Sequence, residues 1–183
     1  MTLKNLIIIR HFKPAIDKKV PVTEWTLDEQ GIKDMNNLLE SFNFKSISKI
    51  HSSPESKALI TANLISKKNN IPLYINENIK EVDRHKAGFI EGDYKELVKK
   101  YLTNSDFEFG WEDLSSVKKR AKEFIKEIEC ENETILIVSH GMFLSILLHK
   151  YFEKDIIDFW LSLKFGELIK VDFKKLKEVW NIN

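Results

Sequence analysis

Cationic and imidazole side chains follow three short apolar stretches of this chain. Cations placed side by side are a poor design for a hydrophobic core but a good one for binding a phosphoryl group. Helices that begin directly after two of these motifs would add backbone N–H groups and the positive ends of their dipoles. The motifs are Arg10-His11, Ser52-Ser53-Pro54 followed by Lys57, and Ser139-His140-Gly141.

The stretches that precede the motifs are predicted to be strands of a parallel sheet. Residues 6–9 form an uninterrupted, mostly β-branched apolar run, which is typical of a strand buried on both faces. Ligands of open α/β sheets bind just beyond the carboxyl ends of the strands. If these strands are parallel neighbours, the motifs therefore converge on one crevice. The other predicted strands are 46–51, Leu73–Ile75 and Thr134–Ser139.

Helical periodicity fills most of the segments between the strands. A helix over residues 27–42 carries an apolar stripe at positions i, i+3, i+4 and i+7, and Thr26 is its predicted N-cap. The next helix opens with Pro54, a residue favoured in the first turn, and runs to residue 68. Further helices are predicted over 93–101 and 114–129, from 141 onward, and over 155–163.

The order of elements predicts a fold class. Residues 167–173 and 177–182 are expected to close the sheet as an antiparallel hairpin around Lys174-Lys175. Strands that alternate with helices imply a three-layer α/β/α sandwich, with a mostly parallel central sheet and an antiparallel edge. We expect one domain over residues 1–183. Within it, residues 77–112 form an excursion over the sheet edge, because their periodicity is poor.

Composition excludes several classes of function. The 183 residues include 29 basic and 28 acidic side chains, a formal net charge of +1, which argues against a nucleic-acid binder that neutralises many phosphates. The single Cys130 excludes an internal disulfide and a multi-cysteine zinc site. The most apolar stretch, 134–148, is too short to span a membrane and contains His140, so we expect a cytoplasmic protein. Only three of the 29 basic residues are arginines: Arg10, Arg84 and Arg120. A chain that uses lysine almost everywhere else is expected to keep arginine at positions where a planar guanidinium is needed.

The motifs LIIIRH, SSPESKALITA and ILIVSHG, in this order, resemble those of the histidine phosphatase superfamily, which has the phosphoglycerate-mutase-like fold. Weaker similarities are Leu27-x-Glu29-x-Gly31, the segment GFIEG at 88–92, and Arg120. The resemblance implies covalent catalysis, in which His11 attacks phosphorus and becomes a phosphohistidine. The phosphoryl oxygens would then be bound by Arg10, Lys57, His140 and Gly141. For Arg84 two roles are open: a contact with the substrate, or a pair with a nearby carboxylate.

The resemblance also implies an acid that protonates the leaving oxygen. Glu81 is the candidate, because family members place a glutamate shortly after the third strand. The ten-residue spacing from Glu81 to Glu91 is longer than the common pattern, so Asp83, His85 and Glu91 stay open as alternatives. For His11 to act as a nucleophile, its other ring N–H is expected to donate to a backbone carbonyl.

Two positions depart from the family pattern. Phe12 stands where glycine is usual, and we expect it in a loop with negative φ, facing the mouth of the substrate site. Lys57 stands where arginine is usual, which keeps the charge but loses bidentate geometry. Trp25, in the loop after the nucleophile, is a candidate for the rim of the pocket.

The resemblance implies a phosphomonoester hydrolase of the histidine acid phosphatase type, which needs no metal and no cofactor. The expected substrate is a small-molecule phosphoester or a phosphorylated peptide, with no nucleic-acid or membrane partner; the oligomeric state is left open. One alternative is phosphotransfer of the phosphoglycerate mutase type, which uses the same intermediate. Another is a non-catalytic protein that binds a phosphorylated ligand.

Overall fold

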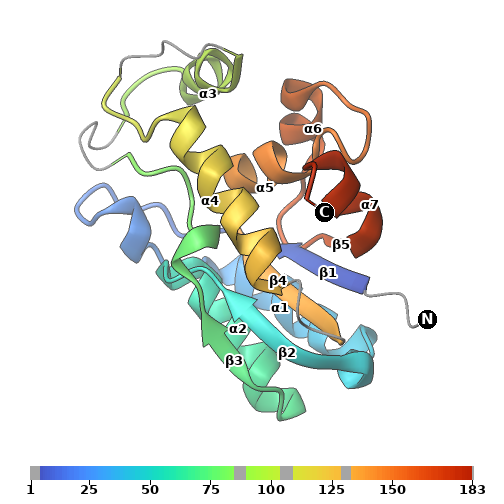
Figure 1. Cartoon of the computed structure of the whole chain (residues 1–183). Coiled ribbons are helices and arrows are strands. Elements are labelled where there is room, and N and C mark those ends of the chain that lie inside the picture. The colour runs from blue at the N-terminus through green and yellow to red at the C-terminus, as the bar shows by residue number, and fades with distance from the viewer. Residues whose placement is uncertain (1–4, 85–89, 104–108, 129–132, 183) are drawn as a thin grey trace.

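The computed structural model describes residues 5–84, 90–103, 109–128 and 133–182. Its centre is a five-stranded sheet in the order β3-β2-β4-β1-β5 (Figure 1). The first four strands in the chain are parallel, and the last one pairs antiparallel with β1 at the edge. The strands are β1 (Asn5–Arg10), β2 (Ile47–Ser52), β3 (Leu73–Ile75), β4 (Thr134–Ser139) and β5 (Leu168–Asp172).

The register brings the ends of the central strands to the same level. Arg10 lies opposite Ser139 in the β1–β4 pair, and Ser52 lies opposite Val138 in the β2–β4 pair. Two further backbone bonds continue the pairing past the strand ends: His11 N–H donates to Ser139 O at 2.9 Å, and Ser53 N–H donates to Val138 O at 3.0 Å. All three motifs therefore begin at the carboxyl ends of neighbouring strands, on the same side of the sheet, as predicted.

Helices cover both faces of this sheet. In β1, Leu6 and Ile8 belong to one buried cluster, whereas Ile7 and Ile9 belong to the other. This alternation follows from the period of two in a strand, and a strand that is apolar at every position can be buried on both faces. In Figure 1, α1 and α2 lie behind the sheet and α4 lies in front. The helices are α1 (Glu29–Ser41) and α2 (Ser56–Asn69) on one face, and α3 (Tyr94–Thr103), α4 (Leu114–Glu127), α5 (Gly141–Leu148), α6 (Ile156–Ser162) and α7 (Phe173–Val179) in the other layer.

The layered α/β/α fold is the one predicted, but the C-terminal hairpin is wrong. Strand β5 forms the expected antiparallel edge by pairing with β1, and no second strand follows it within the described residues up to 182. Instead the chain continues into α7, whose N-cap Asp172 accepts a bond from Lys175 N at 2.8 Å. Phe173 and Leu176, three residues apart, are buried on the inner face of this helix.

The start of α1 also differs from the prediction. Asp28, rather than Thr26, caps this helix, because its carboxylate accepts the Gly31 N–H at 2.7 Å. Thr26 lies in an extended segment in which its carbonyl accepts the Ala15 N–H at 2.9 Å. The other helix ends lie within about two residues of their predicted positions, the usual uncertainty of such boundaries.

Some predictions fall partly outside the described residues. Of the excursion predicted over 77–112, the structure describes 77–84, 90–103 and 109–112, including the short helix η3 (Glu77–Ile79) and α3. His85 and Cys130 lie outside the described residues. Within the described ranges, no helix has both the length and the apolar character needed to cross a membrane.

Candidate active site

A cavity of about 280 Å³ opens where the carboxyl ends of β1, β2 and β4 meet. Arg10 and His11 enter it from the end of β1, Lys57 from the first turn of α2, and Glu81 from the loop after η3. The fully buried ring of His140 follows β4, and its centroid lies 5.0 Å from that of His11. The structure thus brings together side chains that are up to 130 positions apart in the chain.

The His11 ring is oriented by one backbone contact. Its Nδ1 lies 2.7 Å from the carbonyl oxygen of Phe12. Because a carbonyl can only accept, Nδ1 carries the hydrogen and the neutral ring keeps its lone pair on Nε2. Burial, followed by the nearby His140 and Lys57, holds the pKa of His11 well below its ordinary value of 6.5. The ring is therefore uncharged at neutral pH, which is the state that a nucleophile requires.

His140 is uncharged for the same reasons. Burial lowers its pKa well below 6.5, and the positive charges of Lys57 and Arg10 lower it further. Its Nε2 lies 2.7 Å from Ser53 Oγ, which itself accepts the Glu55 N–H at 3.2 Å. Either group can donate in this contact; when Ser53 donates its hydroxyl hydrogen to Nε2, the ring hydrogen is on Nδ1. Among the described residues the buried Nδ1 has no hydrogen-bond partner.

The Arg10 guanidinium is held in a fixed plane. One terminal nitrogen donates to Leu163 O at 2.7 Å, and the group lies 4.0 Å from the centroid of the Phe165 ring. A side chain at Gly141 would meet it, because a Cβ built there lies 3.1 Å from Cζ and from a terminal nitrogen of Arg10. The buried Nε of Arg10 has no hydrogen-bond partner within the described parts of the chain. Gly141 thus leaves room for a guanidinium with a donor free for an anion.

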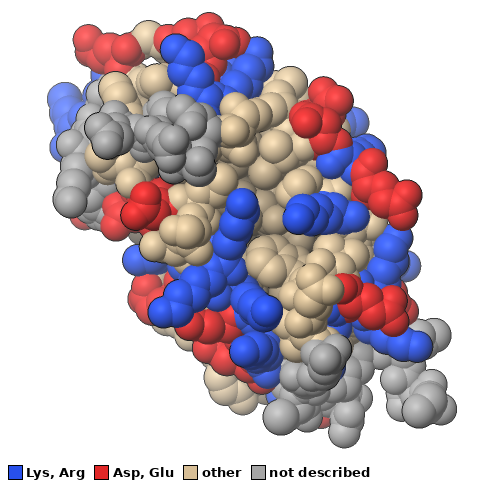
Figure 2. Space-filling model, turned by 45° about the horizontal axis from the view of Figure 1, so that its top comes forward, with Lys and Arg blue, Asp and Glu red and all other residues tan. Residues whose placement is uncertain are grey.

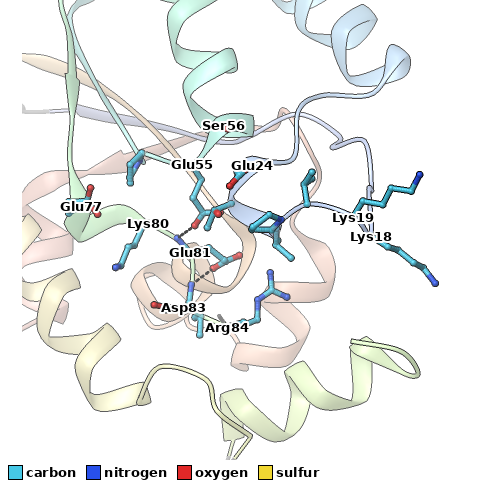
Figure 3. Close-up of a pocket in the computed structure, with 16 residues that line it drawn as sticks. Lys18, Lys19, Glu24, Glu55, Ser56, Glu77, Lys80, Glu81, Asp83 and Arg84 are labelled. Carbon is cyan, nitrogen blue, oxygen red and sulfur yellow. Dashed lines mark hydrogen bonds between the residues drawn. The ribbon is translucent and has the colours of Figure 1, made fainter. Parts of the chain in front are cut away.

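Lys57 is buried beside a carboxylate that the sequence analysis missed. Its Nζ donates to Val22 O at 2.9 Å and to Glu55 Oε2 at 2.5 Å. Glu55 also accepts the backbone N–H of Glu81 at 2.9 Å (Figure 3). A Glu55 carboxylate oxygen lies 3.8 Å from His140 Nε2. Its position just before α2 was visible in the sequence. Its contact with the Glu81 loop was not, because that loop is more than twenty residues away.

The Glu81 carboxylate lies between the cavity and the start of α5. It accepts three backbone N–H groups: from Val82 at 3.0 Å, Met142 at 3.2 Å and Phe143 at 2.9 Å. The side chain also lines the cavity that contains His11. Glu81 is therefore fixed beside the candidate nucleophile, where an acid for the leaving oxygen is needed.

Arg120 holds the loop that carries Glu81. It forms a bidentate pair with Glu112 at 2.9 and 3.0 Å, and its remaining donors bind three loop carbonyls. Ser139, at the end of β4, donates to a fourth carbonyl of this segment at 2.7 Å. The carbonyls bound by Arg120 are those of Asn78, Lys80 and Glu81, and Ser139 binds that of Ile79.

The alternative acids lie in other surroundings. Asp83 lines a larger cavity, of about 610 Å³, which shares Glu81 and Arg84 with the first one but is not lined by His11 (Figure 3). The Glu91 side chain is 82% exposed and lies 3.8 Å from Lys18 in a surface ion pair. His85 is outside the described residues, so the structure does not bear on it. Of the carboxylates considered, Glu81 is the one that lines the cavity with His11.

Three other residues predicted for the site, Phe12, Arg84 and Trp25, differ in where they lie. The Phe12 side chain is 3% exposed and packs in the core behind the sheet, against Gly166, instead of facing the substrate mouth. Its φ is not positive, as expected, and only its carbonyl contributes to the site. Arg84 does line the cavity, where its guanidinium lies 5.2 Å from the ring of Tyr94 and 5.6 Å from that of Trp111. Trp25 lies on the wall of the cavity as predicted.

The sequence pattern of the histidine phosphatase superfamily (branch 1) matches residues 6–180. The chain belongs to this family. The fold is the phosphoglycerate-mutase-like fold expected from the motifs, and solved members resemble this chain over nearly all of both lengths. No curated protein matches its sequence.

Three solved structures illustrate the likeness. Bacillus stearothermophilus YhfR has a TM-score of 0.74 and 21% identity, covering 91% of this chain and 90% of its own. A phosphoserine phosphatase from Entamoeba histolytica, in complex with 3-phosphoglyceric acid, has a TM-score of 0.67 and 25% identity, covering 92% and 90%. A mycobacterial glucosyl-3-phosphoglycerate phosphatase has a TM-score of 0.69 and 14% identity, covering 91% and 89%.

Proposed function

We propose that this family member is a metal-independent phosphomonoester hydrolase that works through a phosphohistidine on His11. The observation that carries the proposal is the hydrogen bond from His11 Nδ1 to Phe12 O, which leaves Nε2 unprotonated beside Arg10 and His140. Similar folds in proteins named as phosphatases support the reaction class.

In the first step, the Nε2 lone pair forms a bond to phosphorus while the P–O bond to the leaving alcohol breaks. The Glu81 carboxyl transfers its proton to the leaving oxygen, so the alcohol departs neutral. Arg10 and His140 donate hydrogen bonds to the phosphoryl oxygens, where charge has to be stabilised. The Lys57 ammonium group also lines the cavity and stabilises this charge, although its ion pair with Glu55 neutralises part of its own.

In the second step, water attacks phosphorus and the P–N bond breaks. Glu81 takes the proton of the attacking water, which restores its acid form, and inorganic phosphate and neutral His11 are released. The positively charged side chains supply the electrostatic stabilisation, so the proposal requires no divalent ion. We expect EDTA to leave the rate of phosphate release unchanged.

A panel of phosphomonoesters tests the proposal by the inorganic phosphate released. His11→Ala should reduce release to background, and Glu81→Gln should reduce it by roughly 10²- to 10⁴-fold. A phosphoryl label that is acid-labile and base-stable should appear on the wild type and be lost in His11→Ala. His149→Ala, which changes a histidine outside the cavity, is the matched control and should keep full activity.

The same panel separates the alternatives. Isomerised phosphoglycerate with little free phosphate would indicate a mutase. Binding of phosphate analogues without hydrolysis of any ester and without label on His11 would indicate a non-catalytic binding protein. Either result would overturn the hydrolase proposal.

A further inference from the structure

The side chains that line the cavity around His11 fall into two chemically different groups. One group is Arg10, His11, Lys57 and Glu81, which are assigned above to the phosphoryl transfer. The other group, called the apolar wall here, consists of apolar and aromatic side chains from separate segments of the chain. Its members include Ile16, Trp25, Ile90, Tyr94 and Phe165.

The contacts of these side chains fix several of them in place. The Trp25 indole N–H donates to Asp17 O at 2.8 Å, and the loop that carries Trp25 is closed by the bridge between Pro14 and Leu27. The Phe165 ring lies 5.5 Å from the His11 ring, centroid to centroid, and under the Arg10 guanidinium. A wall formed in advance loses little conformational entropy when a ligand binds. The apolar wall is therefore a binding surface that already has its shape.

Two large apolar side chains of this wall are exposed to solvent. Ile16 is 68% exposed and Phe165 is 41% exposed. A single exposed apolar residue needs no explanation, but exposed apolar groups that rim a cavity are typical of a ligand-binding surface. A ligand that covered them would gain the hydrophobic free energy of that surface.

One charged side chain, Arg84, lines the cavity next to the apolar wall among the described residues. Its guanidinium lies over the rings of Tyr94 and Trp111, and its positive charge is the one feature of this surface that would attract an acidic group. The larger cavity beyond Glu81 has lysines and carboxylates together, and Figure 3 shows Lys18 and Lys19 extending away from Glu55 and Glu81. Figure 2 shows a face with both signs of charge between uncharged residues.

We propose that the preferred substrates are monoesters whose leaving alcohol carries an apolar or aromatic group that packs against Ile16, Trp25, Tyr94 and Phe165. This inference rests on the proposed hydrolase function and names its substrate class. The volume of about 280 Å³ for the whole cavity limits that group to the size of a short alkyl chain or a single ring.

Ethyl, butyl and hexyl phosphate test the inference, because their leaving alcohols have nearly the same basicity and differ in apolar surface. Each methylene that becomes buried should raise kcat/KM by up to about fourfold. We expect a rise of at least about tenfold from ethyl to hexyl phosphate. We also expect 2-carboxyethyl phosphate to be slower than propyl phosphate. Binding of the matching alkylphosphonates, measured by calorimetry, should follow the same order without any reaction.

Substitutions in the cavity test which side chains cause the dependence of kcat/KM on chain length. Phe165→Ala and Trp25→Ala should flatten the dependence on chain length, whatever they do to the rate with ethyl phosphate. Leu64→Ala changes a side chain on α2 that is 38% exposed and lies outside the cavity, so it is the matched control and should keep the wild-type dependence.

Three outcomes would overturn the inference, and each has a different consequence for the hydrolase proposal. Phosphate release at one rate along the series would refute the apolar preference while the hydrolase proposal stands. Faster turnover of the carboxyethyl ester than of the propyl ester would assign the site to acidic leaving groups, read by Arg84. If no ester is hydrolysed and the phosphonates bind equally, both proposals fail.

Discussion

At the residue scale, Gly141 gives the Arg10 guanidinium space that a larger side chain would occupy. In Gly141→Ala, the new Cβ would lie 3.1 Å from two guanidinium atoms, so Arg10 has to move by a few tenths of an ångström. A small misplacement of a phosphoryl ligand reduces transition-state stabilisation, and we expect kcat/KM to fall about tenfold.

The measurement is steady-state release of phosphate from a small ester, with urea unfolding to show that the variant is folded. If Gly141→Ala acts through Arg10, it should have no further effect on phosphate binding in an Arg10→Ala background. An equal loss of phosphate affinity in both backgrounds would refute this explanation.

His11 and His140 make the stability depend on pH. Both pKa values are lowered in the folded protein, so below pH 6.5 the unfolded chain holds more protons than the folded one. The free energy of unfolding should therefore fall as the pH falls below 6.5, by up to about 1.4 kcal/mol per pH unit for each histidine. Urea unfolding between pH 7.5 and 5.5 measures this slope. His11→Gln with His140→Gln should remove most of it, and an unchanged slope in that double variant would contradict the assignment.

The burial of His11 also predicts how kcat/KM depends on pH on the acid side. Because the pKa of His11 lies well below 6.5, the ring stays neutral and nucleophilic as the pH falls through that value. We expect kcat/KM for a small ester to show no decline between pH 7.5 and 6.5, and the optimum to be acidic to neutral. An apparent pKa near 6.5 on the acid limb, or a rate still rising above pH 9, would argue against His11 as the nucleophile.

At the scale of elements, α4 positions the loop that carries Glu81. Arg120 on this helix is nearly buried and bonds to Glu112 and three loop carbonyls, so Arg120→Met removes all of these contacts and leaves the Glu112 carboxylate without its cation. Breaking one partner of a buried ion pair costs about 3–5 kcal/mol. We expect a stability loss of that order and a lower kcat, because Glu81 loses its support.

Urea unfolding and the kcat-against-KM split measure these two effects. Lys99→Met removes an exposed ion pair with Glu96 on α3 and is the matched control, which should leave both stability and kcat nearly unchanged. Full kcat in a folded Arg120→Met variant would show that the loop does not need this anchor.

At the scale of the whole molecule, an anion in the cavity should stabilise the fold. Arg10 and His140 each have a buried nitrogen without a hydrogen-bond partner among the described residues, and phosphate or vanadate would supply acceptors. A ligand that binds only the folded state stabilises it by about 2.7 kcal/mol at one hundred times its Kd. Thermal unfolding with increasing vanadate should show a rising midpoint. A midpoint that rises equally in Arg10→Ala would place the anion elsewhere.

Periodicity and local motifs made much of this architecture predictable. The buried runs at β1 and β4 identified parallel strands, because a strand that is apolar at every position has to be covered on both faces. The rule that ligands bind beyond the carboxyl ends of such strands then placed Arg10, His11 and His140 together. These conclusions needed only residue types and their order, because strand period and strand-end geometry are local properties of the chain.

Other features depend on tertiary contacts and could not be predicted from the sequence. The short run after Asp172 became α7 and not a strand, because Phe173 and Leu176 could be buried together on one face of a helix. Phe12 is in the core because Gly166, brought close by the β1–β5 pairing, leaves space for its ring. Glu55 entered the site because the Glu81 loop crosses in front of it. Such contacts join residues far apart in the sequence, and their free energy depends on packing that no local pattern records.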